Sequence, residues 1–274
     1  MTGLQFLAAL LAISLSLSLV MAVAWLVWRQ TRNSGWVDMV WTFGLGMVAV
    51  AGALAAPIGA AGFTTRQALV AGLVAAWSLR LGLHIAKRTS AIEDEPRYAK
   101  LLRNWGDSAS WQMFLLLQKQ ALVSIPLALA AVLAAWNPFP TLRVQDFLGI
   151  AVLLVAILGE MIADNQLRHF RSDGANKGRI CDTGLWAWSR HPNYFFQWLG
   201  WLAYPLLAID LSGSYPWGWL ALIGPACMYW LLVHVSGIPP LEEHMLERRG
   251  EAFRAYQARS NAFFPAPPRA DSLP

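Results

Sequence analysis

The chain has 274 residues, of which 57% are apolar and only 14% are charged, and it contains 15 Trp. This composition excludes an ordinary soluble fold and is typical of an integral membrane protein. The net charge of +5 does not indicate a nucleic-acid partner, because the basic residues are scattered among the connections between apolar segments and do not line one face. We therefore expect an all-α, polytopic integral membrane protein.

Apolar runs of about 20 residues have the length that crosses the hydrocarbon core as a helix. The expected spans, about seven in number, are Leu4–Trp28, Val37–Pro57, Gln67–Ala86, Phe114–Trp136, Phe147–Gln166, Tyr194–Ile209 and Trp217–Gly237. The sixth is the shortest. We expect residues 1–265 to form a single transmembrane domain, followed by a Pro-rich flexible tail over residues 266–274.

The connections after the odd-numbered spans hold most of the 21 basic residues, whereas the opposite connections hold only Arg66 and Arg143. By the positive-inside rule, this asymmetry predicts that the N-terminus lies outside and the C-terminus in the cytoplasm. We expect a bacterial inner membrane protein whose polar site faces the cytoplasm.

Four charged residues follow one face of the helix that ends the fifth span. Glu160, Asp164, Arg168 and Arg171 are spaced i, i+4, i+8 and i+11, which places them on one side of a helix. Two carboxylates at membrane depth favour a polar pocket. The alternative is an intrahelical ladder of ion pairs.

The segment Arg190-His191-Pro192-Asn193-Tyr194 stands where a charged loop gives way to the sixth span. Proline is tolerated only in the first turn of a helix, so Pro192 is predicted to open one. The N–H groups of that first turn have no intrahelical partner and can bind an anion. A simple helix cap with interfacial side chains is an equal alternative.

Polar residues also stand inside the second and third spans. Asp38 lies near the start of the second span, where a carboxylate indicates either a functional site or an ion pair with Arg80. Arg80, His84 and Arg88 follow one helix face in the third span.

His234 and Glu242 lie near the end of the last span, and an amphipathic helix interrupted at Gly250 is expected after Ile238. No pair of histidines has the spacing of metal ligands, so no metal is expected. No Gly-rich motif follows a strand, so a dinucleotide would not be held by a Rossmann unit.

The chain resembles the C-terminal region of the steroid 5α-reductase family in four elements. They are the span-five Asp164, Gly-Leu-Trp at 184–186, Ser-Arg-His-Pro-Asn-Tyr at 189–194, and the C-terminal Gly250, Phe253 and Tyr256. With Ser34–Trp41 and Glu93–Tyr98, the chain is most similar to an uncharacterised bacterial branch of that family. The resemblance implies a seven-helix fold that binds NADPH from the cytoplasm. It also implies reduction of an enone-type carbon–carbon double bond in a steroid-like or other apolar lipid taken from the bilayer.

Carried over by motif, the resemblance places the cofactor in residues 146–265, with contacts from Asp164, Arg168, Arg171 and Asn193. Further expected cofactor neighbours are Arg179, Arg190, His191, Tyr194, Gln197, Arg80, His84, Arg88, His234 and Glu242. Glu160 stands where the family has a carboxamide and Gln197 where it has a glutamate.

The family polarises the substrate carbonyl with a Gln-Glu pair in span two and a Tyr in span three. The counterparts here are Val37-Asp38 and Trp77, so the Tyr is absent. Asp38 is therefore the expected catalytic donor, provided that burial keeps it protonated. Glu160 is the second catalytic candidate.

The Arg-His-Pro-x-Tyr element also resembles membrane methyltransferases that act on isoprenylcysteine or phospholipids. These bind S-adenosylmethionine and pair the element with glutamates in the C-terminal helix, for which Glu242, Glu243 and Glu247 are available. Asp164 with Arg168 and Arg171 suits a phosphate-bearing cofactor better than a sulfonium. The leading interpretation is an NADPH-dependent oxidoreductase of CH–CH bonds; a methyltransferase and a non-enzymatic lipid-binding protein are the alternatives.

Overall fold

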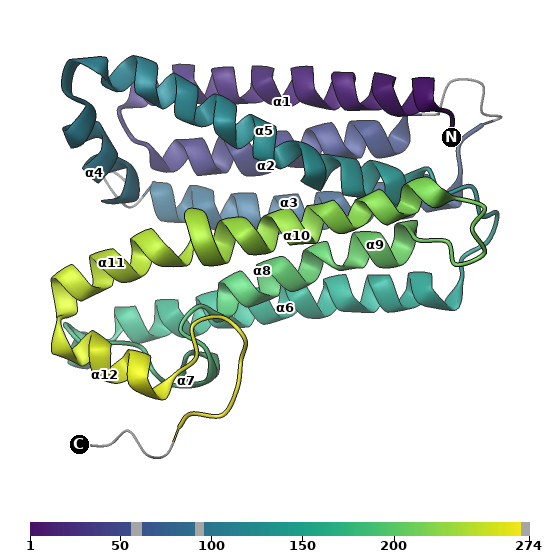
Figure 1. Ribbon diagram of the computed structural model, residues 1–274. Helices are drawn as coiled ribbons and strands as arrows, with labels where there is room; N and C mark the ends of the chain where they lie inside the picture. The colour runs from purple at the N-terminus through teal and green to yellow at the C-terminus, as the bar shows by residue number, and fades with distance from the viewer. Residues whose placement is uncertain (56–61, 91–95, 270–274) are drawn as a thin grey trace. The chain divides into compact units, whose positions relative to one another are not determined.

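The computed structural model describes residues 1–55, 62–90 and 96–269, and the regular elements in these ranges are helices (Figure 1). The long helices are α1 (Gly3–Thr31), α2 (Gly35–Leu54), α3 (Thr65–Thr89), α5 (Ala109–Ala135) and α6 (Val144–Ser172). The shorter helices are α4 (Pro96–Trp105), α7 (Leu185–Trp188), α8 (Pro192–Trp201), α9 (Ala203–Ala208), α10 (Ile223–Trp230), α11 (Ile238–Arg249) and α12 (Glu251–Arg259). The described residues also include three 3₁₀ segments, η1 (Gly106–Ser108), η2 (Gly174–Asn176) and η3 (Pro216–Leu222). A π-helical turn, η4, spans Leu231–Val235.

Six helical segments are long and apolar enough to cross a membrane, which indicates an integral membrane protein. They are Gly3–Thr31, Gly35–Leu54, Thr65–Thr89, Leu101–Ala135, Val144–Ser172 and Pro216–Arg249. The expected span Tyr194–Ile209 differs, because it consists of two helices of 10 and 6 residues that meet at Leu202. The expected end of the second span, Pro57, lies outside the described residues.

The packing divides the chain into two compact units, where the sequence suggested a single domain. Unit 1 comprises Met1–Ile150 and Ala203–Cys227, and unit 2 comprises Ala151–Leu202 and Met228–Pro274. The chain therefore leaves unit 1 within α6 and returns to it at the start of α9.

In unit 1, α2 packs against α1, α3 and α5 (Figure 1). Small residues allow this close approach: a Cβ on Gly46 would lie 2.1 Å from the hydroxyl of Ser78 on α3. That hydroxyl donates a hydrogen bond to the carbonyl of Thr42 at 3.1 Å, which satisfies it inside the bundle. The last third of α5, from Leu127 to Ala135, is entirely buried.

In unit 2, α6 and α8 lie side by side and antiparallel. A Cβ on Gly159 would meet the ring of Phe196 at 2.3 Å, and a Cβ on Gly200 would meet Ala156 at 3.4 Å. Later residues of α8 therefore contact earlier residues of α6. This pairing fixes which polar side chains of the two helices stand at the same level.

The C-terminal part of unit 2 confirms the predicted interruption of an amphipathic helix. Gly250 has a φ of 48° and separates α11 from α12, a backbone conformation that glycine adopts without steric cost. Phe253 and Tyr256 then bury their rings.

The segment after α12 differs from the expected flexible tail over 266–274. The Ala266 N–H donates to the Trp188 carbonyl at 3.1 Å, and the Arg269 N–H donates to the Arg259 carbonyl at 3.0 Å. These main-chain hydrogen bonds fix the first part of the predicted tail, and residues 270–274 lie outside the described chain.

Candidate functional site

The head of α8 is tied to the C-terminal segment of unit 2. Pro192 opens the helix as predicted, with His191 in the N-cap position. Just before it, the Arg190 N–H donates to the Asn261 carbonyl at 2.8 Å, and the Ser189 hydroxyl donates to the Phe263 carbonyl at 2.9 Å. The element that the sequence singled out is therefore positioned by a segment about 70 residues further along the chain.

Arg190, His191, Glu242 and Gln257 form what we call the Arg190 cluster. Arg190 Nε lies 2.7 Å from Glu242 Oε1, and its Nη1 donates to the carbonyls of Gln257 and Ser260. Gln257 Nε2 donates to Glu242 Oε2 at 2.7 Å. The Arg190 guanidinium thus joins the head of α8 to α11 and to the end of α12, because all three of its nitrogens are directed at protein oxygens.

His191 is 4% exposed, stacks on Tyr194 with ring centroids 5.4 Å apart, and places Nε2 3.0 Å from Glu242 Oε1. Burial lowers the pKa of His191 from its ordinary value, an effect that the hydrogen bond and charge of Glu242 partly offset. The ring is neutral at pH 7 and donates from Nε2, since a carboxylate only accepts. His191, Tyr194 and Glu242 therefore support the head of α8.

Two buried carboxylates of α6 face two carboxamides of α8. Glu160 and Asp164 are 5% and 8% exposed, and Asn193 Nδ2 lies 3.5 Å from Asp164 Oδ1. Gln197, 8% exposed, stands one turn beyond Asn193 just as Glu160 stands one turn before Asp164. We call these four residues the carboxylate–carboxamide site. The structure thus brings Asp164 and Asn193 together, with Glu160 and Gln197 one turn further along the two antiparallel helices.

The arginines expected beside this site are on the surface of unit 2. Arg168, Arg171 and Arg179 are exposed, and Arg168 Nη2 donates to the Asn165 carboxamide. Arg168 and Arg171 continue α6 beyond Asp164, so the helix passes from buried carboxylates to exposed guanidiniums within two turns.

Unit 1 contains a polar chain that the sequence did not reveal. The Tyr98 hydroxyl of α4 donates to Asp38 Oδ1 at 3.2 Å and accepts from Gln120 Nε2 at 3.0 Å. Tyr98 is 1% exposed and Asp38 is half-buried. The three residues come from α4, α2 and α5, with 60 residues between Asp38 and Tyr98, so no local spacing could pair them. The only sequence signal was a tyrosine in an otherwise charged connection.

The remaining candidates occupy separate places. Arg80 and His84 are half-buried on α3 and Arg88 is exposed, and all three belong to unit 1. His234 is exposed in η4, where its ring lies edge-on to Tyr229 at 5.8 Å. A π-helical turn often marks a functional position, and this one directly precedes α11, which carries Glu242.

Six candidate membrane spans and a carboxylate–carboxamide site buried between α6 and α8 define a polytopic helical membrane protein with a polar interior site. The family model described as a protein of unknown function (DUF1295) matches residues 24–260. The chain belongs to this family.

One curated relative is an uncharacterised protein of Schizosaccharomyces pombe. It is 28% identical over 142 residues, which are 44% of this chain and 39% of the relative. The chain therefore matches about two fifths of that protein's length. No solved structure matches the chain significantly.

Proposed function

We propose that the protein is a membrane-embedded, NADPH-dependent reductase of an enone-type double bond in a steroid-like or other apolar lipid. The observation that carries this proposal is the carboxylate–carboxamide site, which continues along α6 into exposed arginines. The proposal also draws on the resemblance of residues 159–265 to the steroid 5α-reductase family. The cytoplasmic orientation predicted from the basic residues agrees with a soluble nucleotide as co-substrate.

The donors and acceptors of the site suit a nicotinamide. Its carboxamide presents two N–H donors and one carbonyl acceptor. The carboxylates of Asp164 and Glu160 can accept from the N–H groups, and the amide nitrogens of Asn193 and Gln197 can donate to the carbonyl. NADPH supplies the hydride when bound, and the protein's contribution here is to hold the ring in a buried place from which water is excluded.

Arg168 and Arg171 suit the phosphates of the same cofactor. The guanidinium fork binds phosphate oxygens with paired hydrogen bonds. Both side chains are exposed on the α6 segment that follows Asp164. In a dinucleotide the phosphates lie at a distance from the nicotinamide, so a nicotinamide near Asp164 leaves the phosphates for the two arginines. Arg190 is left out of this set because its guanidinium holds Glu242.

Enone reduction also needs a group that polarises the carbonyl and carries a proton. From the sequence, Asp38 was the expected donor and Glu160 was the second catalytic candidate. Because Tyr98 and Asp38 share a hydrogen bond of 3.2 Å and Gln120 orients the phenol oxygen, we assign the role to the Tyr98–Asp38 pair. The phenol O–H now donates to Asp38 Oδ1, and a substrate oxygen would take the place of that carboxylate oxygen as its acceptor.

Binding to the purified protein in detergent tests the cofactor. We expect NADPH to bind more tightly than NADH, and Asp164→Ala and Asn193→Ala each to weaken NADPH about tenfold, the loss of one charge-assisted hydrogen bond. Arg254→Ala is the control, since that side chain is 66% exposed and pairs with the exposed Glu251. Binding of S-adenosylmethionine with no response to NADPH would overturn the proposal.

A turnover measurement tests the proton donor. Tyr98→Phe keeps the ring and removes the O–H, so we expect kcat to fall by about 10²–10⁴, the usual contribution of a general acid, while the affinity for NADPH stays within twofold. Equal loss of NADPH affinity and kcat would instead make Tyr98 a structural residue.

One observation favours a second candidate, a membrane methyltransferase. The resemblance to that group implies a pairing of the Arg-His-Pro-x-Tyr element with a C-terminal glutamate, and Glu242 lies 2.7 Å from Arg190. The same titration separates the two candidates. A methyltransferase is expected to bind S-adenosylmethionine and not NADPH.

A further inference from the structure

The segment that follows α12 in unit 2 forms a closed loop. The Arg269 N–H donates to the Arg259 carbonyl at 3.0 Å, so the chain leaves the end of α12 and returns to it. We call residues 260–268 the C-terminal loop, and the two arginines mark its base. In Figure 1 this yellow segment rises from α12 toward α8 and then turns back. Phe263 and Phe264 stand near the middle of the loop and form its tip.

The two phenylalanines of the tip pack on aromatic side chains of α8 and α10. Phe263 is 4% exposed, and its ring centroid lies 5.9 Å from that of Phe195 and 5.4 Å from that of Tyr229. The Phe264 ring lies 5.7 Å from Trp198 and stacks on Tyr229 at 6.1 Å, yet Phe264 is 50% exposed. One ring of the tip is therefore buried in unit 2, and the other is half open.

Main-chain hydrogen bonds hold both arms of the C-terminal loop beside the head of α8. Before the tip turns, the Ser189 hydroxyl donates to the Phe263 carbonyl at 2.9 Å. Beyond the tip, the Ala266 N–H donates to the Trp188 carbonyl at 3.1 Å. The exposure of Phe264 thus belongs to a segment that is fixed on either side.

The antiparallel pairing of α6 with α8 gives the depth of the tip along unit 2. A Cβ on Gly159 would meet the Phe196 ring at 2.3 Å, so the α8 residues that contact the tip stand level with this part of α6. The first exposed basic residue beyond it on α6 is Arg168, nine residues later and about 14 Å along the axis. Around Gly159, the side chains exposed on α6 are large and apolar: Leu154, Val155, Leu158, Met161 and Ile162. In a membrane protein such a surface faces lipid, so the tip lies at the depth of a lipid-facing surface.

Polarity along the C-terminal loop decreases from its base to its tip. Arg269 is exposed at the base, where Arg259 pairs with Asp182. The arm that contains Ala266 lies against Trp188, which is 49% exposed. Residues 260–269 include no acidic side chain. The order of arginine, tryptophan and phenylalanine is the order in which these side chains occur from the aqueous surface into the apolar layer of a membrane.

We propose that the C-terminal loop enters the membrane and that Phe264 contacts the acyl chains of lipids. The partner is the leaflet on the side of the basic residues, which the sequence predicts to be the cytoplasmic one. The depth of the tip favours lipid as the occupant, since a half-exposed ring level with lipid-facing apolar side chains meets the same surroundings. Through the Ser189 hydroxyl, the loop ties the head of α8 to the membrane surface. This interaction does not depend on the proposed reaction.

Nitroxide labels report the surroundings of the tip. Replacing the two native cysteines, by Cys181→Ala and Cys227→Ala, leaves a chain in which single cysteines can be labelled. The labelled positions are Phe264→Cys, Leu154→Cys on the exposed apolar surface of α6, and Ala258→Cys on the exposed surface of α12. In liposomes of phosphatidylethanolamine and phosphatidylglycerol, we would measure the collision rates of each label with oxygen, which concentrates in lipid, and with a water-soluble nickel chelate.

We expect the label at Phe264 to behave like the label at Leu154, with more frequent collisions with oxygen than with nickel. The label at Ala258 should show the reverse. A label at Phe264 that behaves like the label at Ala258 would place the tip in water and overturn the proposal. Shielding of the Phe264 label from both reagents would also overturn it, because a second copy of the chain or another protein would then cover the tip.

A charge at the tip gives a second test, in the chain with its native cysteines. Phe264→Glu places a carboxylate at the depth of lipid, which is unfavourable, whereas Phe264→Leu removes the ring and keeps an apolar side chain. In liposomes, we expect hydrogen exchange at the Ala266 amide to rise about tenfold in Phe264→Glu and to stay within twofold of wild type in Phe264→Leu. Ala258→Glu, the control, adds the same charge on α12 and should leave this exchange unchanged.

Equal acceleration of exchange in Phe264→Glu and Phe264→Leu would show that ring packing holds the loop without lipid, and would refute the proposal. If Phe264→Glu does not fold, the labels still decide.

Discussion

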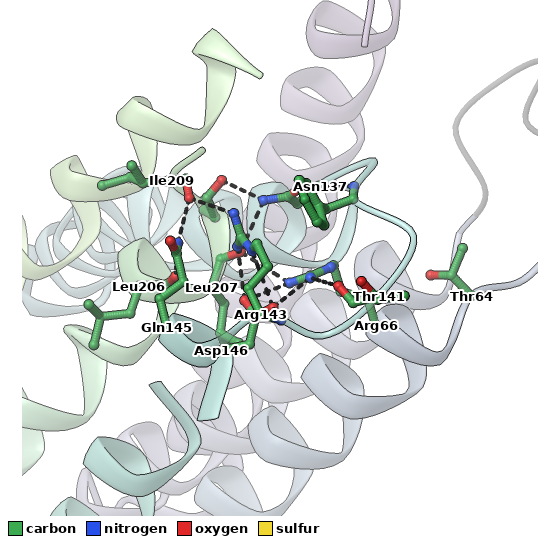
Figure 2. A network of polar contacts seen from close by, with 12 residues as sticks. Thr64, Arg66, Asn137, Thr141, Arg143, Gln145, Asp146, Leu206, Leu207 and Ile209 are labelled. Atoms are coloured by element: carbon green, nitrogen blue, oxygen red, sulfur yellow. Dashed lines mark hydrogen bonds and ion pairs between the residues drawn. The ribbon is translucent and has the colours of Figure 1, made fainter. Parts of the chain in front are cut away.

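The α9 cap of unit 1 and the Arg190 cluster of unit 2 are built from the same parts: arginine, a carboxylate and the carbonyls of a distant segment. In the α9 cap, Arg66 and Arg143 bind Asp146 and donate to the carbonyls at the end of α9 (Figure 2). They differ in burial and in charge. Asp146 is 0% exposed and meets two arginines, whereas the Glu242 side chain is 13% exposed and meets one arginine and a neutral histidine. The first cluster has fixed charges, whereas the second contains a histidine, His191, whose pKa is lowered by burial.

The two clusters therefore have different structural roles. The α9 cap holds a helix end through side chains of Arg66, Arg143, Asn137 and Gln145. The Arg190 cluster sets the position of His191, two residues before Asn193 of the carboxylate–carboxamide site. A change in protonation can therefore reach the proposed cofactor site in unit 2, while the α9 cap is insensitive to pH near neutrality.

The largest effect is expected from Asp146→Ala. It leaves two guanidiniums buried without their carboxylate, so the free energy of unfolding should fall by about 3–5 kcal/mol. Asp182→Ala breaks the half-exposed pair with Arg259 and should cost at most about 1 kcal/mol. Denaturation in detergent measures both. Equal small losses would mean that the hydrogen bonds to α9 hold the cap without help from the ion pair.

Glu242→Gln comes next, because it removes the charge opposite Arg190 but keeps an acceptor. We expect a loss of about 1–3 kcal/mol and faster hydrogen exchange at the Arg190 amide, which donates to Asn261. Glu243→Gln, on the adjacent exposed residue, serves as the control. Unchanged exchange at Arg190 would contradict a role of Glu242 in positioning the head of α8.

Tyr256→Phe tests the uncharged support of the Arg190 cluster. The buried hydroxyl of Tyr256 donates to the carbonyl of Trp186, and its loss leaves that acceptor in an apolar place. The expected cost is about 1 kcal/mol in the free energy of unfolding. Tyr229→Phe, in the aromatic cluster with Phe263, should cost less, and the reverse order would refute the assignment.

The smallest effect is the pH dependence that His191 confers. Its folded pKa is lowered by burial, so the unfolded chain binds the proton more readily and stability falls as pH drops below the unfolded value of about 6.5. For a strongly lowered folded pKa, the loss between pH 7 and pH 6 is about 0.7 kcal/mol. His191→Gln should abolish this slope, and a slope that persists in the variant would place the titrating group elsewhere.

Local patterns in the sequence predicted local structure well. Pro192 begins α8 and Gly250 separates α11 from α12, because proline and glycine act through their own backbone. The one-face row of Glu160 and Asp164 was also visible, since helical periodicity fixes it. The apolar character of Tyr194–Ile209 hid the break at Leu202, although Gly200 and Pro205 flank the junction.

Pairings between distant helices were beyond the sequence. Arg66 and Asp146 are 80 residues apart, and Arg190 and Glu242 are 52 apart, so only the packing of helices brings them together. Arg190 was expected beside the cofactor because of the family resemblance, and its partner Glu242 could not be identified from the sequence. Arg66 and Arg143 are the two basic residues in connections that otherwise lack them. This was the available signal in the sequence that the two arginines have a structural role.

The order in which the chain closes unit 1 has a consequence for its biosynthesis. Arg66 and Asp146 are made early, but the Leu207 carbonyl that completes the cap lies 64 residues beyond Arg143. During synthesis, Asp146 is therefore available to pair with Arg66 and Arg143 before the carbonyls of α9 exist. The remaining hydrogen bonds of the two guanidiniums form only when residues 203–227 arrive.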